Sequence, residues 1–279
     1  MKMKKENKNI KTKKNYHKFE LYEAAVQDPE GEIEIIDQFF RENFDHEAQV
    51  FREDFCSTFL NACQWVKIAQ DHHSIAVDLD PRALAYGKKH HASKLNSEEQ
   101  NRVSTFQANV MNVVAPSSDI ISISNFSIGF LRNRKELLEY FSKCYRDLSQ
   151  EGMIVFDLLG GFEVSHTQKE KRKVTLSDGT KVNYIWEHAQ FNPINREAVF
   201  HIHFSWGKGQ EKKKAFSYHW RMWTIPEISD VLREAGFQDV KVYWENDDED
   251  GEGNGTFSAK KKVEDCAIWI VYVAGLKKT

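Results

Sequence analysis

Four short polar segments of the chain contain side chains that could bind a ligand. They are Arg-Glu-Asp-Phe-Cys-Ser-Thr at 52–58, Val-Asp-Leu-Asp-Pro at 77–81, Gln-Ala-Asn-Val at 107–110 and Ser-Asn-Phe-Ser at 124–127. Each follows a run of residues typical of a β-strand, and ligands of open α/β sheets bind beyond the carboxyl ends of the strands. The first segment ends in small hydroxyl residues, so its backbone N–H groups could bind an anion. Together the segments predict one binding edge.

The residue types at this edge suit a nucleoside. Asp78 directly follows the second expected strand, where a carboxylate can accept hydrogen bonds from both ribose hydroxyls. We expect Asp80 to cap the next helix, which leaves Asp78 for the ligand. Asn109 offers an amide to an adenine amino group, and Asn125 and Phe126 form a polar rim with an aromatic ring. No G-x-G-x-x-G follows the first strand, which argues against an NAD-dependent oxidoreductase.

Strands and helices alternate along most of the chain, as is typical of an α/β fold with a mostly parallel sheet. We expect strands at 48–51, 74–78, 103–107, 119–125, 153–159, 239–245 and 267–274, and helices at 32–43, 57–70, 81–91, 133–148 and 224–236. The strand at 153–159 is apolar except for one Asp, as expected for a strand buried on both faces. A long acidic loop joins the last two strands, which predicts an antiparallel pair at one edge of the sheet.

The hydrophobic period changes after residue 161. Residues 171–223 alternate polar and apolar types and are interrupted by Ser-Asp-Gly, Asn-Pro-Ile-Asn and Gly-Lys-Gly turns. This pattern predicts an antiparallel β insert of three or four strands after the fifth strand of the α/β unit.

From about Tyr22 onward, these features resemble a class I S-adenosylmethionine-dependent methyltransferase, a Rossmann-like fold with a seven-stranded, mostly parallel sheet and a terminal antiparallel hairpin. Glu53 matches the acid that opens the family's glycine-rich motif, Asp78 matches the ribose-binding acid, and Asn109 stands where the family often has an acid near the adenine. Three positions usually held by glycine are Phe55, Ser57 and Phe59. The form Glu-Asp-Phe-Cys-Ser-Thr is similar to that of a bacterial subgroup.

The resemblance implies S-adenosylmethionine as the cofactor and S-adenosylhomocysteine as its product. It implies cofactor contacts from Tyr22, Arg52, Glu53, Phe55, Cys56, Ser57, Thr58, Asp78, Leu79, Asn109, Val110, Asn125 and Phe126. Tyr22 enters this set because a leading helix often folds over the cofactor in the family. For Arg52 two roles remain open, since it could pair with Glu53 or reach the methionine carboxylate.

The reaction would be an in-line displacement of methyl from the sulfonium, which needs alignment and exclusion of water more than a strong acid or base. The acceptor is expected to be a small molecule, selected by the insert. Expected acceptor contacts are Tyr184, Trp186, His203, Trp220 and Arg221, and candidates for a base are His201, His203, His219 and Tyr218. The aromatic residues of the insert, Trp223 included, could equally form its own core, whereas we expect the histidines and Arg221 to face the cleft.

Composition narrows the alternatives. The first 18 residues contain eight lysines and one glutamate, and the rest carries 31 basic and 41 acidic side chains. An acidic body argues against nucleic acid as a partner, and the chain has no Pro-Cys pair of the kind used by cytosine-C5 enzymes. The longest strongly apolar run, at 267–276, is too short to span a membrane. Four cysteines without a C-x-x-C pair indicate reduced thiols in a cytoplasmic protein.

We expect neither a zinc site at His201 and His203, which lack a full ligand set, nor a calcium site at 246–257, because the twelfth position is Phe257. The predicted organisation is a disordered basic tail at 1–16, an S-adenosylmethionine-binding α/β domain at 17–161 and 224–279, and the β insert at 162–223 as a substrate lid. The alternative to an enzyme is a nonenzymatic nucleoside-binding or regulatory protein on the same fold.

Overall fold

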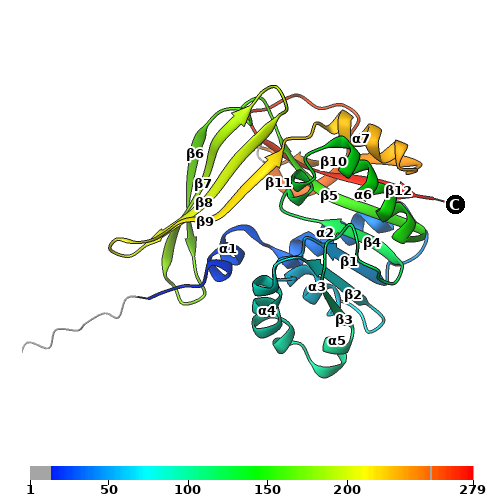
Figure 1. The fold of residues 1–279 in the computed structure, drawn as a ribbon, viewed down its shortest axis with the longest axis horizontal. Coiled ribbons are helices and arrows are strands. Elements are labelled where there is room, and N and C mark those ends of the chain that lie inside the picture. Colours follow the sequence, from blue (N-terminus) through cyan, green and yellow to red (C-terminus); the bar gives the residue numbers. More distant parts are fainter. Residues whose placement is uncertain (1–13, 252, 279) are drawn as a thin grey trace, which may run out of the picture.

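The computed structural model describes residues 14–251 and 253–278, and this part of the chain forms two β-sheets (Figure 1). The larger sheet has eight strands in the order β11-β10-β12-β5-β4-β1-β2-β3. Its strands are β1 (Val50–Asp54), β2 (His73–Asp78), β3 (Val103–Gln107), β4 (Ser118–Ile123), β5 (Leu148–Gly160), β10 (Asp239–Asp247), β11 (Gly253–Ala259) and β12 (Trp269–Lys277). Because β1 to β5 pair in parallel, their carboxyl ends lie along one edge, as the α/β prediction requires.

Helices cover both faces of this sheet. The helices are α1 (Lys18–Val26), α2 (Pro29–Arg41), α3 (Leu60–Trp65), α4 (Pro81–His90), α5 (Ser97–Asn101), α6 (Arg134–Asp147) and α7 (Ile225–Glu234), with 3-10 turns η1 (Ala92–Lys94) and η2 (Ser127–Phe130). Alternate strand residues point to opposite faces, so Ile121 and Ile123 of β4 pack in the layer of α6 and α7, whereas Ile120 packs in the layer of α2 and α3. No helix of the described residues is long and apolar enough to cross a membrane.

The smaller sheet is the insert between β5 and α7. It consists of β6 (Gln168–Thr175), β7 (Lys181–Asn192), β8 (Glu197–Trp206) and β9 (Gln210–Arg221), all antiparallel. The predicted antiparallel insert is therefore confirmed, with four strands. Its apolar face packs against Leu21 and Ala25 of α1, so this helix lies between the insert and the main sheet (Figure 1).

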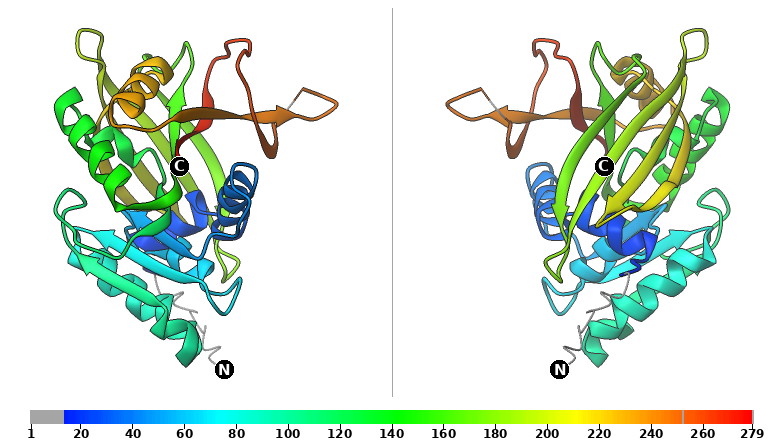
Figure 2. Two further views of the ribbon diagram at one scale, coloured as in Figure 1. Left: turned by 90° about the vertical axis from the view of Figure 1, so that its right-hand side faces the viewer. Right: turned by 90° about the vertical axis from the view of Figure 1, so that its left-hand side faces the viewer.

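The edge strand β11 was not predicted, and the main sheet has eight strands rather than seven. β11 pairs with β10 inside the region that we expected to be an acidic loop, and the β10–β11 hairpin projects from the molecule (Figure 2). Its Gly-Asn-Gly start lacks the β-branched and aromatic residues by which strands are usually detected. The predicted antiparallel pair of β10 and β12 is present, with β12 next to β5.

The expected basic tail lies only partly within the described residues. Residues 1–13 lie outside them, whereas Lys14 pairs with Asp178 of the insert. Tyr16 is 7% exposed, and its hydroxyl bonds with Asp178 (2.8 Å) and Thr180 (2.7 Å). The predicted tail boundary at residue 16 is therefore wrong, because contact with the insert is already made at Lys14.

Candidate functional site

The turn between β1 and α3 has an unusual backbone. Phe55, Ser57 and Phe59 have positive φ angles of 56°, 48° and 48°, a left-handed conformation that costs an L-residue about 1–2 kcal/mol. These are the three positions at which the methyltransferase family that the sequence resembles usually has glycine. The chain keeps a glycine-type backbone without the glycines, so its surroundings must hold the turn in place. The turn also explains why α3 begins at Leu60 and not at the predicted residue 57.

The neighbouring elements hold this turn from two sides. The Cys56 N–H donates to a carbonyl of β2 (3.1 Å), and the Ser57 N–H donates to the Asp78 carboxylate (2.7 Å). On the other side, α4 comes so close that a Cβ at Gly87 would lie 2.2 Å from the Thr58 carbonyl oxygen. The turn is thus clamped between the end of β2 and α4.

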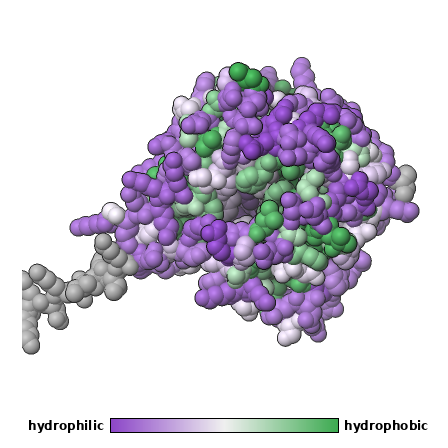
Figure 3. All heavy atoms as spheres, viewed as in Figure 1, coloured by the Kyte–Doolittle hydropathy of each residue, from purple (hydrophilic) through white to green (hydrophobic). Residues whose placement is uncertain are grey.

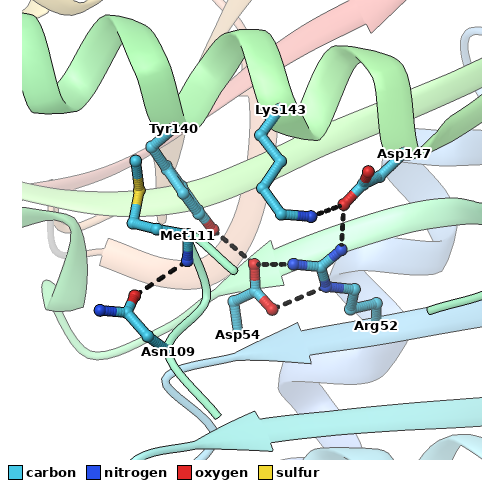
Figure 4. A network of polar contacts seen from close by, with 7 residues as sticks. All are labelled: Arg52, Asp54, Asn109, Met111, Tyr140, Lys143 and Asp147. Carbon is cyan, nitrogen blue, oxygen red and sulfur yellow. Dashed lines mark hydrogen bonds and ion pairs between the residues drawn. The ribbon is translucent and has the colours of Figure 1, made fainter. Parts of the chain in front are cut away.

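A buried ion-pair network lies beneath the turn (Figure 4). Arg52 is 0% exposed and donates two hydrogen bonds to Asp54 (2.7 and 2.9 Å) and one to Asp147 of α6 (2.6 Å). Tyr140 donates to the same Asp54 carboxylate (2.7 Å), and Lys143 pairs with Asp147. Buried charges are tolerated only when they are paired in this way. The network fastens the end of β1 to α6.

Both roles expected for Arg52 are therefore wrong. Arg52 and Asp54 are two residues apart, so they share one face of β1, while Glu53 points to the other. A side chain that is 0% exposed also cannot reach a ligand carboxylate. Glu53 itself is 3% exposed and accepts the Ala62 N–H (3.1 Å), and burial raises its pKa well above the usual range. It secures the start of α3.

Cys56 and Thr58 connect the turn to its surroundings. Cys56 is 3% exposed, and burial raises the pKa of its thiol well above the usual range, which disfavours the reactive thiolate form. The Thr58 hydroxyl donates to Glu23 of α1 (2.7 Å), which also lies 2.8 Å from a ring nitrogen of His91. Helix α1 is thereby tied to the turn.

The ends of β2 and β3 lie beside this turn. Asp78 accepts N–H groups from Ser57 and Asp80 (both 2.7 Å), and burial raises its pKa while those bonds oppose the shift. Leu79 is 63% exposed at the same edge. The Asn109 side-chain oxygen accepts the Met111 N–H (2.9 Å; Figure 4). The NH₂ group of the same side chain is therefore more available to a ligand than the oxygen is.

Val110 differs from the other expected contacts at the end of β3. Its side chain is 4% exposed and packs in the main core. Any contribution of Val110 to ligand binding would therefore come from its backbone.

The turn after β4 repeats the strained conformation. Asn125 and Phe126 have φ angles of 57° and 59°, and their N–H groups donate to the two carboxylate oxygens of Asp157 (2.9 and 2.7 Å). Burial raises the pKa of Asp157 to about 8, although both hydrogen bonds oppose the shift. Sequence reasoning missed Asp157, but the signal was present as the one acid in an apolar strand.

A cavity of about 700 Å³ lies between the insert and the main sheet. On the face of the molecule shown in Figure 3, apolar side chains gather around a hollow near the middle. The lining residues come from α1, α2, the ends of β4 and β5, the insert strands and the terminal hairpin, and they include Tyr22, Glu32, Asn125, Phe126, Asp157, Tyr184, Trp186, His188, Ile202, Tyr218, Trp220 and Tyr272. The Tyr22 ring lies 4.9 Å from the Phe216 ring of β9, a contact that connects α1 to the insert.

The predicted histidines do not face this cavity. Along β8, Ile202 lines it, so His201 and His203 point to the opposite face of the insert. His201 bonds there with Ser217 (2.8 Å) and His203 with Glu187 (2.7 Å). The expectation that these histidines face the cleft is therefore wrong.

The same alternation displaces two further candidates on β9. His219 bonds with Glu197 (2.9 Å) on the outer face. Arg221 pairs with Glu227 (2.9 Å) and lies over the Trp223 ring, which packs in the main core. His219 and Arg221 are therefore away from the cavity, so their expected placement is also wrong, whereas a core position had been left open for Trp223.

Two lining residues were missed in addition to Asp157. Glu32 of α2 accepts a hydrogen bond from Asn61 (3.0 Å), and burial raises its pKa. His188 of β7 is 5% exposed, and burial lowers its pKa. No sequence signal separates Glu32 from the other acids of α2, since only the packing of that helix shows which one points inward.

Comparison with known proteins gives distant matches. No family model matches the chain. It is 24% identical over 123 residues to "Putative methyltransferase YqeM" of Bacillus subtilis, a match to 43% of this chain and 48% of that protein. It is 23% identical over 182 residues to a "Putative methyltransferase" of Geobacillus, a match to 63% of this chain and 70% of that protein. The chain thus matches about half the length of the first of these relatives.

Solved structures match over nearly the whole chain. A Clostridium acetobutylicum S-adenosylmethionine-dependent methyltransferase has a TM-score of 0.64 at 18% identity and covers 91% of this chain and 96% of its own. CalS10, an amino pentose methyltransferase from Micromonospora echinaspora, has a TM-score of 0.66 at 14% identity and covers 94% and 98%. The chain therefore has the class I S-adenosylmethionine-dependent methyltransferase fold, as the sequence predicts.

Proposed function

We propose that the protein transfers a methyl group from S-adenosylmethionine to a small-molecule acceptor. The observation that carries this proposal is the left-handed turn at 55–59, which lies against Asp78 at the carboxyl edge of a class I fold. A chain maintains such strain at three non-glycine residues where the conformation serves a site. Its similarity to solved methyltransferases, among them the sugar N-methyltransferase KedS8, supports a small acceptor.

The residues at the edge fit the proposed cofactor. Asp78 would accept the ribose hydroxyls, Leu79 would cover the adenine with its exposed side chain, and Asn109 would donate its amide to a ring nitrogen. The turn at 55–59 and the rim of Asn125 and Phe126 would surround the rest. S-adenosylmethionine supplies the electrophilic methyl, and the chain aligns the acceptor and excludes water.

The acceptor would bind in the cavity between the insert and the main sheet. Tyr184, Trp186 and Trp220 line it from the insert, and Tyr22 of α1 lines it from the other side. The insert at 162–223 would thus select the acceptor, as a substrate lid. In the transfer itself, the acceptor lone pair forms the new bond to carbon while the carbon–sulfur bond breaks and leaves its electron pair on sulfur.

Calorimetry with S-adenosylmethionine, S-adenosylhomocysteine and NAD tests the proposal. We expect both adenosyl ligands to bind and NAD not to bind. Asp78→Ala should weaken S-adenosylhomocysteine binding about 10- to 150-fold, because the ribose loses a charged acceptor worth about 1.5–3 kcal/mol. Asp80→Ala is the matched control, since this acid caps α4 and pairs with an exposed arginine. Equal losses in both variants, or binding of NAD alone, would overturn the proposal.

A further inference from the structure

The acidic and aromatic lining of the cavity suggests which kind of acceptor it binds. Glu32 comes from α2 and Asp28 caps that helix, while Asp157 comes from β5 and Glu170 from β6. The cations on the same wall are Lys171, which is exposed, and Arg172.

Arg172 is already engaged in other contacts. Its guanidinium donates to the Ala25 carbonyl and lies 4.8 Å from the centre of the Tyr184 ring. It is not paired with Glu32 or Asp157, the two acids that line the cavity from α2 and β5.

These two acids are close enough to affect each other. The charge of Glu32 helps to raise the pKa of Asp157. Two carboxylates in one partly buried site repel, and a cation between them relieves both the repulsion and the cost of burial. The electrostatics of the cavity thus favour a positively charged guest.

Aromatic side chains cover the remaining walls. Trp186, Tyr218 and Trp220 lie next to one another on the insert, with the Tyr218 and Trp220 rings stacked at 4.3 Å. Ring faces attract cations. The buried ring nitrogens Trp220 Nε1 and His188 Nδ1 have no hydrogen-bond partner among the described residues, although both residues line the cavity. Polar atoms left unpaired beside a cavity indicate a ligand with polar groups of its own.

We propose that the methyl acceptor is an amine, which binds as its ammonium ion between the Glu32 and Asp157 carboxylates and the aromatic wall of the insert. The inference rests on the proposed function. The ammonium gives one proton to Asp157, and the nitrogen lone pair of the neutral amine then attacks the methyl carbon. As the nitrogen–carbon bond forms, the carbon–sulfur bond breaks with its electron pair on sulfur, and the methylated nitrogen carries the positive charge.

The pKa of Asp157 supports this assignment. A pKa raised to about 8 makes the Asp157 carboxylate a stronger base than an ordinary aspartate, as a group that takes a proton from an ammonium must be. An alcohol acceptor would need neither two carboxylates nor a cation-binding wall.

Two probes of the same shape, cyclohexylamine and cyclohexanol, test the inference in the presence of saturating S-adenosylhomocysteine. Binding can be followed by tryptophan fluorescence, because Trp186 and Trp220 line the cavity. We expect the amine to bind at least about tenfold more tightly than the alcohol, since charge-assisted contacts exceed neutral ones. Glu32→Gln should reduce this preference about tenfold while keeping the contact with Asn61.

Asp157→Asn should have the same effect, but it also disturbs the turn at 125–126, so Glu32→Gln is the deciding variant. Glu34→Gln, an exposed change on the same helix, is the matched control and should leave the preference intact. Equal binding of both probes, failure of the amine to bind, or an unchanged preference in Glu32→Gln would overturn the amine assignment. Failure of S-adenosylhomocysteine itself to bind would overturn the proposed function instead.

Discussion

The cofactor edge and the acceptor cavity of this protein are built by different means. At the cofactor edge, backbone groups of the turn at 55–59 bond to the end of β2, and a buried network fixes the strand below. In the cavity, side chains from α1, α2, β5, the insert and the terminal hairpin converge from distant parts of the chain. The first region depends on backbone geometry, and the second depends on which face of each element turns inward.

This difference explains how the turn dispenses with glycine. Three left-handed non-glycine residues are tolerated because β2 is hydrogen-bonded to the turn and α4 packs against it at Gly87. The cavity has no comparable backbone framework, except at the turn after β4, where Asp157 holds two N–H groups. Substitutions at the edge should therefore change stability, and substitutions in the cavity should change selectivity.

The largest expected effect is on the buried network. Arg52→Met should lower the free energy of unfolding by about 3–5 kcal/mol, because it leaves Asp54 buried without its cation. Urea or guanidinium unfolding measures the change. Arg82→Met is the matched control, since that arginine is 79% exposed in its pair with Asp80 and its loss should change the free energy of unfolding far less. Similar losses in both variants would show that the network does not support the edge.

What the sequence could predict follows the same division. Asp78 and the turn at 55–59 were found because they lie in one short stretch directly after a strand, and chain position alone places them at the carboxyl edge. The faces of the insert could not be assigned in this way. Alternation in β8 separates His201 and His203 from Ile202, but it does not say which set faces the cavity. That choice depends on α1, whose apolar residues pack on the Ile202 face.

Arg52 and Glu32 illustrate two further limits. The partner of Arg52 was expected to be its neighbour in sequence, whereas strand geometry pairs it with a residue two positions away and with a helix nearly a hundred residues distant. Glu32 is one of several acids on α2, and its inward direction depends on how that helix packs. Both require tertiary contacts that no local pattern contains.

A pH series tests the protonation of Asp157 in the cavity. Burial raises the pKa of Asp157 from its ordinary 3.8 to about 8, so the folded state holds a proton that the unfolded state releases. This contribution to stability is complete below about pH 4 and is lost as the pH rises towards 8. We expect Asp157→Asn to unfold with a shallower loss of stability between pH 5 and pH 8 than the wild type, as measured by denaturant titration.

The exposed Asp230→Asn should keep the wild-type slope. Other buried acids, such as Glu53, also contribute to that slope, so the difference between the two variants is the quantity to compare. An identical slope in Asp157→Asn would mean that this carboxyl group is ionised in the folded protein.

The smallest expected effect is at Ser57, where the side chain can be changed without removing the backbone contact to Asp78. Ser57→Gly should raise the free energy of unfolding by up to about 1.5 kcal/mol. A left-handed L-residue costs about 1–2 kcal/mol, which glycine avoids. Glycine's extra freedom in the unfolded chain offsets about 0.5–1 kcal/mol of this stabilisation. S-adenosylhomocysteine affinity should stay within about twofold, because the same N–H donates to the same carboxylate.

Ser57→Ala separates strain from loss of the hydroxyl, since alanine keeps the Cβ and hence the steric cost at a φ of 48°. We expect alanine to leave stability near the wild-type value and glycine to increase it, as measured in parallel denaturant titrations. If Ser57→Ala stabilises the protein as much as Ser57→Gly, the gain comes from loss of the hydroxyl and not from relief of backbone strain. The contacts of β2 and α4 with the turn would then not be holding a strained conformation. If glycine weakens cofactor binding, the side chain at 57 contacts the cofactor directly, and the edge depends on side chains as the cavity does.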